Sequence, residues 1–127
     1  AAFVEQDNVR IVEIGLSEIP SNSRLAHAIR QAMAIALEAK DQLELVSRIW
    51  EAFKYFDPVH TNNNAAFVAA SLIFAGDDYK KGITTAVLGS WDTDCNGATV
   101  GSIMGAKLGA SRLPEHWMAP LHDTLRK

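Results

Sequence analysis

The chain has 127 residues, a formal net charge of −3 at pH 7 and a single cysteine, Cys95. This length suits one domain with one core, the dispersed charges exclude the basic stripe of a nucleic-acid-binding protein, and no apolar stretch is long enough to cross a membrane. A single cysteine excludes an internal disulfide and a thiolate zinc cluster. The N-terminus also lacks the pattern of a secretory signal, so we expect the reducing cytoplasm as the location.

Two amphipathic helices are predicted in the first part of the chain. Asp7 or Asn8 is a suitable N-cap for the first helix, which should end at Pro20. Ser21 and Ser23 then open a second helix. Its apolar stripe is expected to face the core and consists of Leu25, Ile29, Ala32, Met33, Ala36 and Leu37.

A third helix follows a capping pair of the form Asp-x-x-Glu, made by Asp41 and Glu44, and should end before Pro58. Its apolar and aromatic stripe is expected to lie in the core and consists of Leu45, Val46, Ile49, Trp50, Phe53 and Phe56. A loop rich in turn-forming and amide residues comes next. Asn62 or Asn63 is the expected cap of the helix after it.

The next segment, residues 65–75, is apolar on every side except at Ser71. A helix of this kind cannot lie on a surface, so it should run through the middle of a bundle. Asp77 and Asp78 begin a fifth helix, which should end at Gly89. Nothing alternates with period two for long enough to argue a strand, so the sequence predicts an all-α multi-helix bundle forming one unit over residues 1–127.

Four glycines mark the helix that follows, at every fourth position: Gly97, Gly101, Gly105 and Gly109. Because a glycine inside a helix is unfavourable by roughly 0.5–1 kcal/mol relative to alanine, this stripe predicts close approach of another backbone. A last short helix is expected after Pro114, held by apolar side chains at Trp117, Leu121 and Leu125.

The turn before the glycine helix carries Asp92 and Asp94, two residues apart and surrounded by small and amide residues. Two carboxylates at this spacing suit a hard cation such as Mg²⁺ or Ca²⁺. Two alternatives are open. The segment from Asp92 resembles the start of an EF-hand calcium loop, although Ile103 stands where the bidentate glutamate belongs, and the two acids could instead cap the helix.

Residues 89–106 also resemble the C-terminal signature of the ADP-ribosylglycohydrolase family, in which Asp-Thr-Asp precedes a helix of small residues. Further similarity lies at 60–66 and 113–117, and the match extends from about Ile19 to the end of the chain. The resemblance implies an all-α fold with a binuclear magnesium centre. It also implies hydrolysis of the glycosidic bond that joins ADP-ribose to a modified side chain or small molecule.

On this resemblance Asp92 and Asp94 are the two carboxylate ligands of the metal. Cys95 stands where many members have a threonine ligand. Because a neutral thiol is a poor ligand for Mg²⁺, Cys95 is expected to line the pocket, and Mn²⁺ is a second possible metal. The resemblance places His60 and Asn63 near the pocket, with a surface histidine and a capping amide as the alternatives. Trp91 is expected either to form a pocket wall or to pack under the turn.

Family members also have an N-terminal half with a glycine-acid motif and a Thr-Asp-Asp cluster, and neither occurs in these residues. The chain is therefore expected to be the C-terminal part of a longer domain, with its general base elsewhere and no activity alone. Its expected partners are this missing half and an ADP-ribosylated protein or small molecule. The competing hypotheses are a non-catalytic helical module of the same fold and a calcium-binding helical protein.

Overall fold

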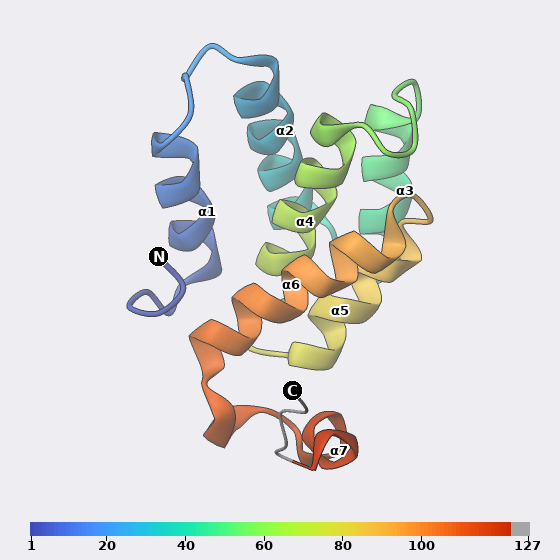
Figure 1. Ribbon diagram of the computed structural model, residues 1–127. Coiled ribbons are helices and arrows are strands. Elements are labelled where there is room, and N and C mark those ends of the chain that lie inside the picture. Colours follow the sequence, from blue (N-terminus) through green and yellow to red (C-terminus); the bar gives the residue numbers. More distant parts are fainter. Residues whose placement is uncertain (123–127) are drawn as a thin grey trace.

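A computed structural model describes residues 1–122 of the chain, and this part contains helices and no strand. The helices are α1 (Asn8–Ser17), α2 (Arg24–Glu38), α3 (Gln42–Phe53), α4 (Thr61–Ala75), α5 (Tyr79–Leu88), α6 (Thr93–Leu108) and the short α7 (Glu115–Met118) (Figure 1). Two single-turn 3₁₀ helices, Ala110–Arg112 and Ala119–Leu121, flank α7. The predicted all-α class is confirmed. No helix among the described residues is both long and apolar enough to span a membrane.

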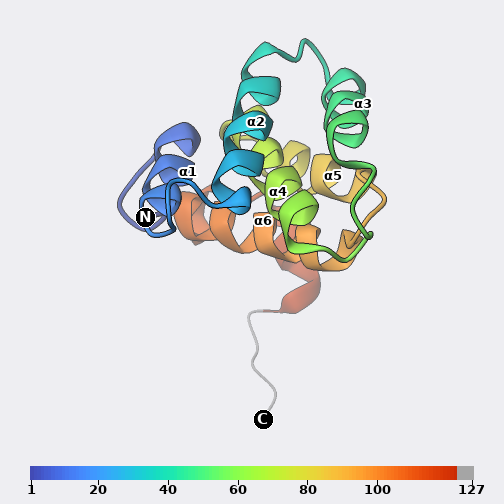
Figure 2. The same ribbon diagram turned by 90° about the horizontal axis from the view of Figure 1, so that it is seen from above.

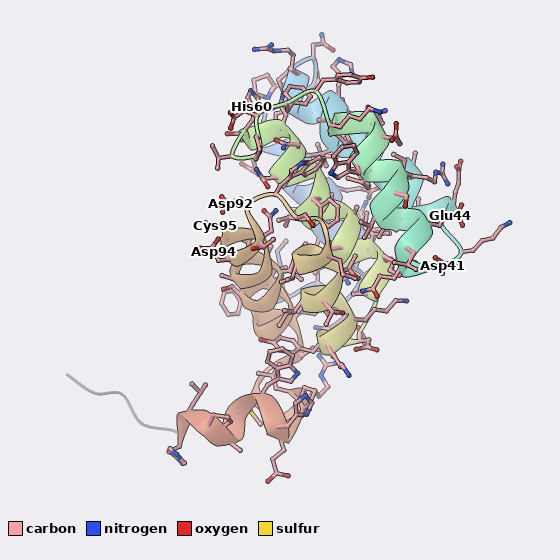
Figure 3. All side chains as sticks on the ribbon, turned by 90° about the vertical axis from the view of Figure 1, so that its right-hand side faces the viewer. Asp41, Glu44, His60, Asp92, Asp94 and Cys95 are labelled. Atoms are coloured by element: carbon pink, nitrogen blue, oxygen red, sulfur yellow. The ribbon has the colours of Figure 1, made fainter. Side chains whose placement is uncertain are left out.

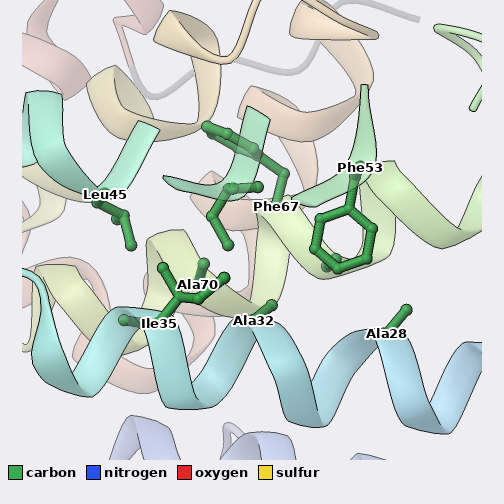
Figure 4. Packing of buried hydrophobic residues seen from close by; sticks show 10 residues of the cluster. Ala28, Ala32, Ile35, Leu45, Phe53, Phe67 and Ala70 are labelled. Atoms are coloured by element: carbon green, nitrogen blue, oxygen red, sulfur yellow. The ribbon is translucent and has the colours of Figure 1, made fainter. Parts of the chain in front are cut away.

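Helix α4 lies at the centre of the bundle and contacts α1, α2, α3, α5 and α6 (Figure 2). One face packs against α2 and α3 through small residues and rings, among them Ala32, Phe53 and Phe67 (Figure 4). The other face packs against α1, α5 and α6, with Val100 and Met104 fully buried there. The prediction that this apolar segment runs through the middle of the bundle is confirmed.

The predicted helix starts are confirmed at four caps. The side chains of Asp7, Ser23, Asp41 and Asp78 each accept a hydrogen bond from a backbone N–H in the first turn of the helix that follows. Each such cap contributes about 1 kcal/mol to stability. These side chains act within their own turn, which is why the sequence reveals them.

The start of α4 differs from the prediction. Its cap is His60, whose Nδ1 accepts a hydrogen bond from the backbone N–H of Asn62 at 3.1 Å. Asn62 and Asn63 lie inside the first turn, so the prediction that one of them caps the helix is wrong. His60 caps the helix because it occupies the N-cap position, one residue before the first helical residue, Thr61, whereas both amides follow Thr61.

Two predicted core residues lie on the surface: Leu37 is 64% exposed and Trp50 is 42% exposed. Leu37 belongs to the last turn of α2, and Trp50 faces outward, with Lys54 Nζ 5.8 Å from its ring centroid. Helix α3 ends at Phe53, so Phe56 lies beyond it, although its ring still packs against the core. Residue spacing alone therefore overestimates how much of the surface of α2 and α3 is buried against the rest of the bundle.

The glycine stripe of α6 is packed closely against α5 over only part of its length. A Cβ atom at Gly97 would lie 3.1 Å from Val87 Cγ2, so the close neighbour is a side chain of α5 and not a backbone. Gly105 has open space around it, and Gly109 ends the helix with φ +68°, where glycine is favoured. The close approach of another helix is therefore found at Gly97 and at Gly101, where α5 packs against α6, and it is absent at Gly105.

An aromatic contact joins helix α7 to the bundle within the described residues: the ring of Trp117 meets that of Tyr79 edge-on, with centroids 5.6 Å apart. Leu121 is 67% exposed and does not form a buried anchor. Leu125, the third predicted anchor, lies outside the described residues. The buried apolar residues of the described part of the chain all precede α7.

A buried lysine joins three parts of the chain at the end of α6. The Lys107 ammonium donates to Asn8 Oδ1 at 2.7 Å and to the Gly76 carbonyl at 3.1 Å, and it forms an ion pair with Asp77 Oδ1 at 2.7 Å. Its side chain is 1% exposed. A buried ammonium needs such partners because an unpaired charge in the interior is very unfavourable. The network fixes α1 and the end of α4 to α6.

Asp77→Asn is expected to lower the free energy of unfolding at neutral pH by at most about 1 kcal/mol, because Asp77 is 69% exposed and solvent screens the pair. The hydrogen bond from Lys107 and its charge lower the pKa of Asp77. The contribution is therefore present above the ordinary Asp value of about 3.9 and is lost as pH falls through the lowered pKa. Urea denaturation from pH 7 downward should show the two proteins converging, whereas Glu115→Gln on α7 should change nothing.

Candidate metal centre

The turn between α5 and α6 is anchored on the core by an aromatic pair. The ring of Trp91 meets Phe67 of α4 edge-on, with centroids 5.9 Å apart. Gly89 lies directly on Phe67, and a Cβ atom there would be 2.7–2.9 Å from three atoms of that ring. A side chain at this position would force the Phe67 ring or the turn to shift. Trp91 therefore packs under the turn, which is one of the two places predicted for it.

Asp92 and Asp94 follow at the beginning of α6, on the same side as Cys95 (Figure 3). One carboxylate oxygen of each acid and the Cys95 Sγ all lie within 4.8 Å of one another. Asp92 is half-buried, whereas Asp94 and Cys95 are exposed. In the part of the chain that the structure describes, this is the group of acidic and thiol side chains close enough together to hold an ion.

The backbone around these acids bears on the two alternatives to a metal site, which are helix capping and an EF-hand loop. Asp92 occupies the N-cap position of α6 but its side chain makes no capping hydrogen bond, whereas Asp94 lies in the first turn of α6, where the helix dipole favours a carboxylate. Because α6 is helical from Thr93 onward, the irregular twelve-residue loop of an EF-hand cannot form here. The EF-hand interpretation is wrong. Two neighbouring carboxylates also repel each other unless a cation or a proton lies between them, so the helix dipole alone does not explain the presence of both.

The donor set fits a hard divalent cation at its two carboxylates and not at its thiol. A hydrogen bond to Asp92 raises the pKa of Cys95, and the negative charges of Asp92 and Asp94 add to this effect. The thiol is therefore neutral at physiological pH, and a neutral thiol is a poor ligand for Mg²⁺. Asp92 and Asp94 are the residues that could hold Mg²⁺ or Mn²⁺.

Asn64 connects this turn to the start of α4, and sequence reasoning missed it. Its Oδ1 accepts hydrogen bonds from the Asp92 backbone N–H at 3.3 Å and from Asn96 Nδ2 at 2.8 Å. Its own Nδ2 donates to the carbonyls of Pro58 and His60 at 2.8 and 3.0 Å. Asn64 therefore uses both ends of its amide to position the backbone that carries Asp92.

His60 and Asn63, which were predicted to lie near the pocket, have other surroundings. Asn63 is fully buried and donates to the Asp57 carbonyl at 3.2 Å, while its Oδ1 has no partner among the described residues. His60 caps α4 and its ring lies 4.8 Å from that of Phe56. Cys95 lines a cavity that lies beside the acids. His60, Asn63 and Trp91 are not among the described residues of its lining.

That cavity has a volume of about 510 Å³ and lies between α1, α2, α4 and α6. Its polar lining includes Asp92, Cys95 and Asn96, and aliphatic side chains from all four helices form most of its walls. The sequence could not reveal it because its lining comes from segments as far apart as Ile11 and Ile103. Only the packing of the helices brings these residues together.

Asn64→Leu is expected to lower the free energy of unfolding by about 1–3 kcal/mol, because the backbone and side-chain groups that bond to its amide lose their partner. Thermal or urea denaturation measures the loss. The control is Thr99→Ala, whose hydroxyl bonds only within α6, to the Cys95 carbonyl, and which should change stability by less than about 0.5 kcal/mol. Equal stability of the two variants would contradict the role given to Asn64.

Comparison with known proteins gives one match. The family model of ADP-ribosylglycohydrolase matches residues 1–127, the whole chain, which is more than the stretch from about Ile19 onward that the sequence motifs indicated. No curated protein and no solved structure matches the chain. This family is all-α and generally metal-dependent, in agreement with the helical bundle and with the acidic cluster at the start of α6. The chain belongs to the ADP-ribosylglycohydrolase family.

Proposed function

We propose that this protein is a metal-dependent hydrolase that cleaves the glycosidic bond between ADP-ribose and an acceptor, and that Asp92 and Asp94 hold its divalent cation. The observation that carries the proposal is the meeting of two carboxylates within 4.8 Å at the start of α6, in a chain that matches the family over its whole length. Mg²⁺ is the first candidate ion and Mn²⁺ the second, because carboxylate oxygens suit both.

The chain's own residues hold and position the proposed ion. Asp92 and Asp94 supply the carboxylates, and Asn64 fixes the backbone of Asp92 by accepting its N–H. The contact between Phe67 and Trp91 holds the turn against the core. When bound, a divalent cation of this kind orients oxygen groups of the substrate and lowers the pKa of a bound water.

Two carboxylates make an incomplete binuclear centre, since a metal pair needs further oxygen ligands. We propose that another part of the same domain supplies these ligands and the general base. The substrate is then an ADP-ribosylated protein or small molecule, and the single cysteine of the chain favours the cytoplasm as the place of action.

The test uses the protein made from the whole natural gene and measures release of ADP-ribose from ADP-ribosylated peptides and small molecules. We expect release that stops when a chelator removes divalent cations and returns when Mg²⁺ or Mn²⁺ is added. A protein that binds ADP-ribose but never hydrolyses a substrate would be the non-catalytic helical module instead. Release that continues unchanged in the chelator would contradict the metal dependence.

A further inference from the structure

Cys95 is a third donor beside the two proposed carboxylate ligands, and the proposed hydrolytic site makes no use of it. It lies in the first turn of α6, on the same side as Asp92 and Asp94 (Figure 3). Its Sγ and one carboxylate oxygen of each acid lie within 4.8 Å of one another, and its S–H group hydrogen-bonds to Asp92. One ion could therefore contact the sulfur and both carboxylates.

The spacing of the three donors suits a tetrahedral ion. Zinc lies about 2.0–2.2 Å from carboxylate oxygens and about 2.3 Å from sulfur, which puts neighbouring donor atoms about 3.5 Å apart. The three donors already lie within 4.8 Å of one another. Asp94 and Cys95 are exposed, so rotation of their side chains can close the remaining distance.

The backbone that carries these donors is held in place without an ion. Asn64 accepts the N–H of Asp92 at 3.3 Å, and α6 is helical from Thr93 onward. Little backbone ordering is then needed when an ion binds. Every divalent cation meets the same three donors, so the chemistry of the donors decides between ions.

Sulfur distinguishes between divalent cations. Carboxylate oxygens bind Mg²⁺, Mn²⁺ and Zn²⁺, whereas a thiolate prefers soft ions such as Zn²⁺ and Cd²⁺. When a soft ion binds here, a metal–sulfur bond forms, the S–H bond of Cys95 breaks, and the proton passes to the solvent. Mg²⁺ gains no bond to sulfur and keeps the two carboxylates alone.

We propose that Cys95 makes this centre selective for thiophilic divalent cations, and that Zn²⁺ or Cd²⁺ is held by Asp92, Asp94 and Cys95 together. The inference rests on the proposed function, because it takes the two aspartates to be metal ligands. It adds a competing ion, since Zn²⁺ bound in this way displaces Mg²⁺ or Mn²⁺ from the same carboxylates.

The test titrates this chain with Cd²⁺, a spectroscopic substitute for Zn²⁺, and follows the ultraviolet charge-transfer absorption of the cadmium–thiolate bond. We expect a band that grows to saturation. Cys95→Ser should remove the band and weaken Cd²⁺ binding, measured by calorimetry, at least about tenfold. The same variant should change Mn²⁺ affinity by less than about threefold, because the carboxylates hold Mn²⁺.

A matched control separates a shared site from a lone thiol. Cys95→Ser combined with Thr99→Cys moves the thiol to the next turn of α6, about 6 Å along the helix axis. Thr99 is exposed, as Cys95 is, so the doubly substituted protein should fold, and circular dichroism verifies this. The moved thiol should bind Cd²⁺ at least about tenfold more weakly than Cys95 does.

Two kinds of result would overturn the inference, and they differ in what they say of the proposed function. In the first, Cys95→Ser or the moved thiol binds Cd²⁺ as tightly as the unmodified chain, while Mn²⁺ binding still depends on both aspartates. The proposed metal site then stands without a role for sulfur. In the second, Asp92→Asn and Asp94→Asn leave both Cd²⁺ and Mn²⁺ affinity unchanged, which would contradict the inference and the proposed metal site together.

Discussion

Asp92→Ala and Asp94→Ala are each expected to abolish metal-dependent release of ADP-ribose, with rates at least about 100-fold lower in the protein made from the whole gene. Each change removes one of the two carboxylates proposed to hold the cation. Neither should unfold the bundle, because Asp94 is exposed and Asp92 makes no capping hydrogen bond. Initial rates at saturating Mg²⁺ and a thermal melt of each variant measure the two effects.

The matched control is Asp41→Ala, at the start of α3 on the opposite side of the bundle (Figure 3). Asp41 accepts a hydrogen bond from the Glu44 backbone N–H at 2.8 Å, so this variant should lose about 1 kcal/mol of stability and keep its activity. The two kinds of aspartate would thus separate a structural role from a role in the metal site. Activity retained by either Asp92→Ala or Asp94→Ala would remove that residue from the site.

Phe67→Ala is expected to lower the free energy of unfolding by about 3–5 kcal/mol, the largest stability effect among the variants considered. Phe67 is 1% exposed and lies in the core cluster shared by α2, α3 and α4. Its loss would leave a cavity under the turn and remove the ring contact with Trp91. Urea denaturation followed by circular dichroism is the measurement, and a loss below about 1 kcal/mol would contradict the anchoring role of this ring.

Gly89→Ala tests the same contact from the other side. The added methyl group would lie under 3 Å from the Phe67 ring, so either the ring or the turn must shift, which typically destabilises by about 1–3 kcal/mol. Gly105→Ala is the control, because nothing lies within 4 Å of its added Cβ and a glycine is removed from a helix interior. We expect Gly105→Ala to stabilise by about 0.5–1 kcal/mol. Similar effects of the two substitutions would contradict the close contact.

Features decided within one turn of the chain could be predicted from the sequence. The caps at Asp7, Ser23, Asp41 and Asp78 depend on a side chain and a backbone N–H two or three residues later. The central position of α4 follows from apolar residues on all its sides, since such a helix has no face for water. Both kinds of signal are present in a short window of sequence.

Features that depend on the rotation of a helix could not be predicted with the same success. Asn63 and Asn64 are neighbours in sequence, yet about 100° of helix rotation separates them, so one is buried and the other reaches Asp92. The partners of Lys107 come from α1 and from the segment after α4, and nothing near Lys107 in sequence indicates them. Such contacts are set by how the helices pack.

The central claim is that Asp92 and Asp94 hold a divalent cation, and titration of this chain with Mn²⁺, followed by electron paramagnetic resonance of the free ion, tests it most directly. We predict saturable binding that weakens at least about tenfold in Asp92→Asn and in Asp94→Asn, because the site loses one ligand charge. Asp41→Asn should bind as the unmodified chain does. Equal Mn²⁺ affinity in all four proteins would contradict the assignment of these two carboxylates.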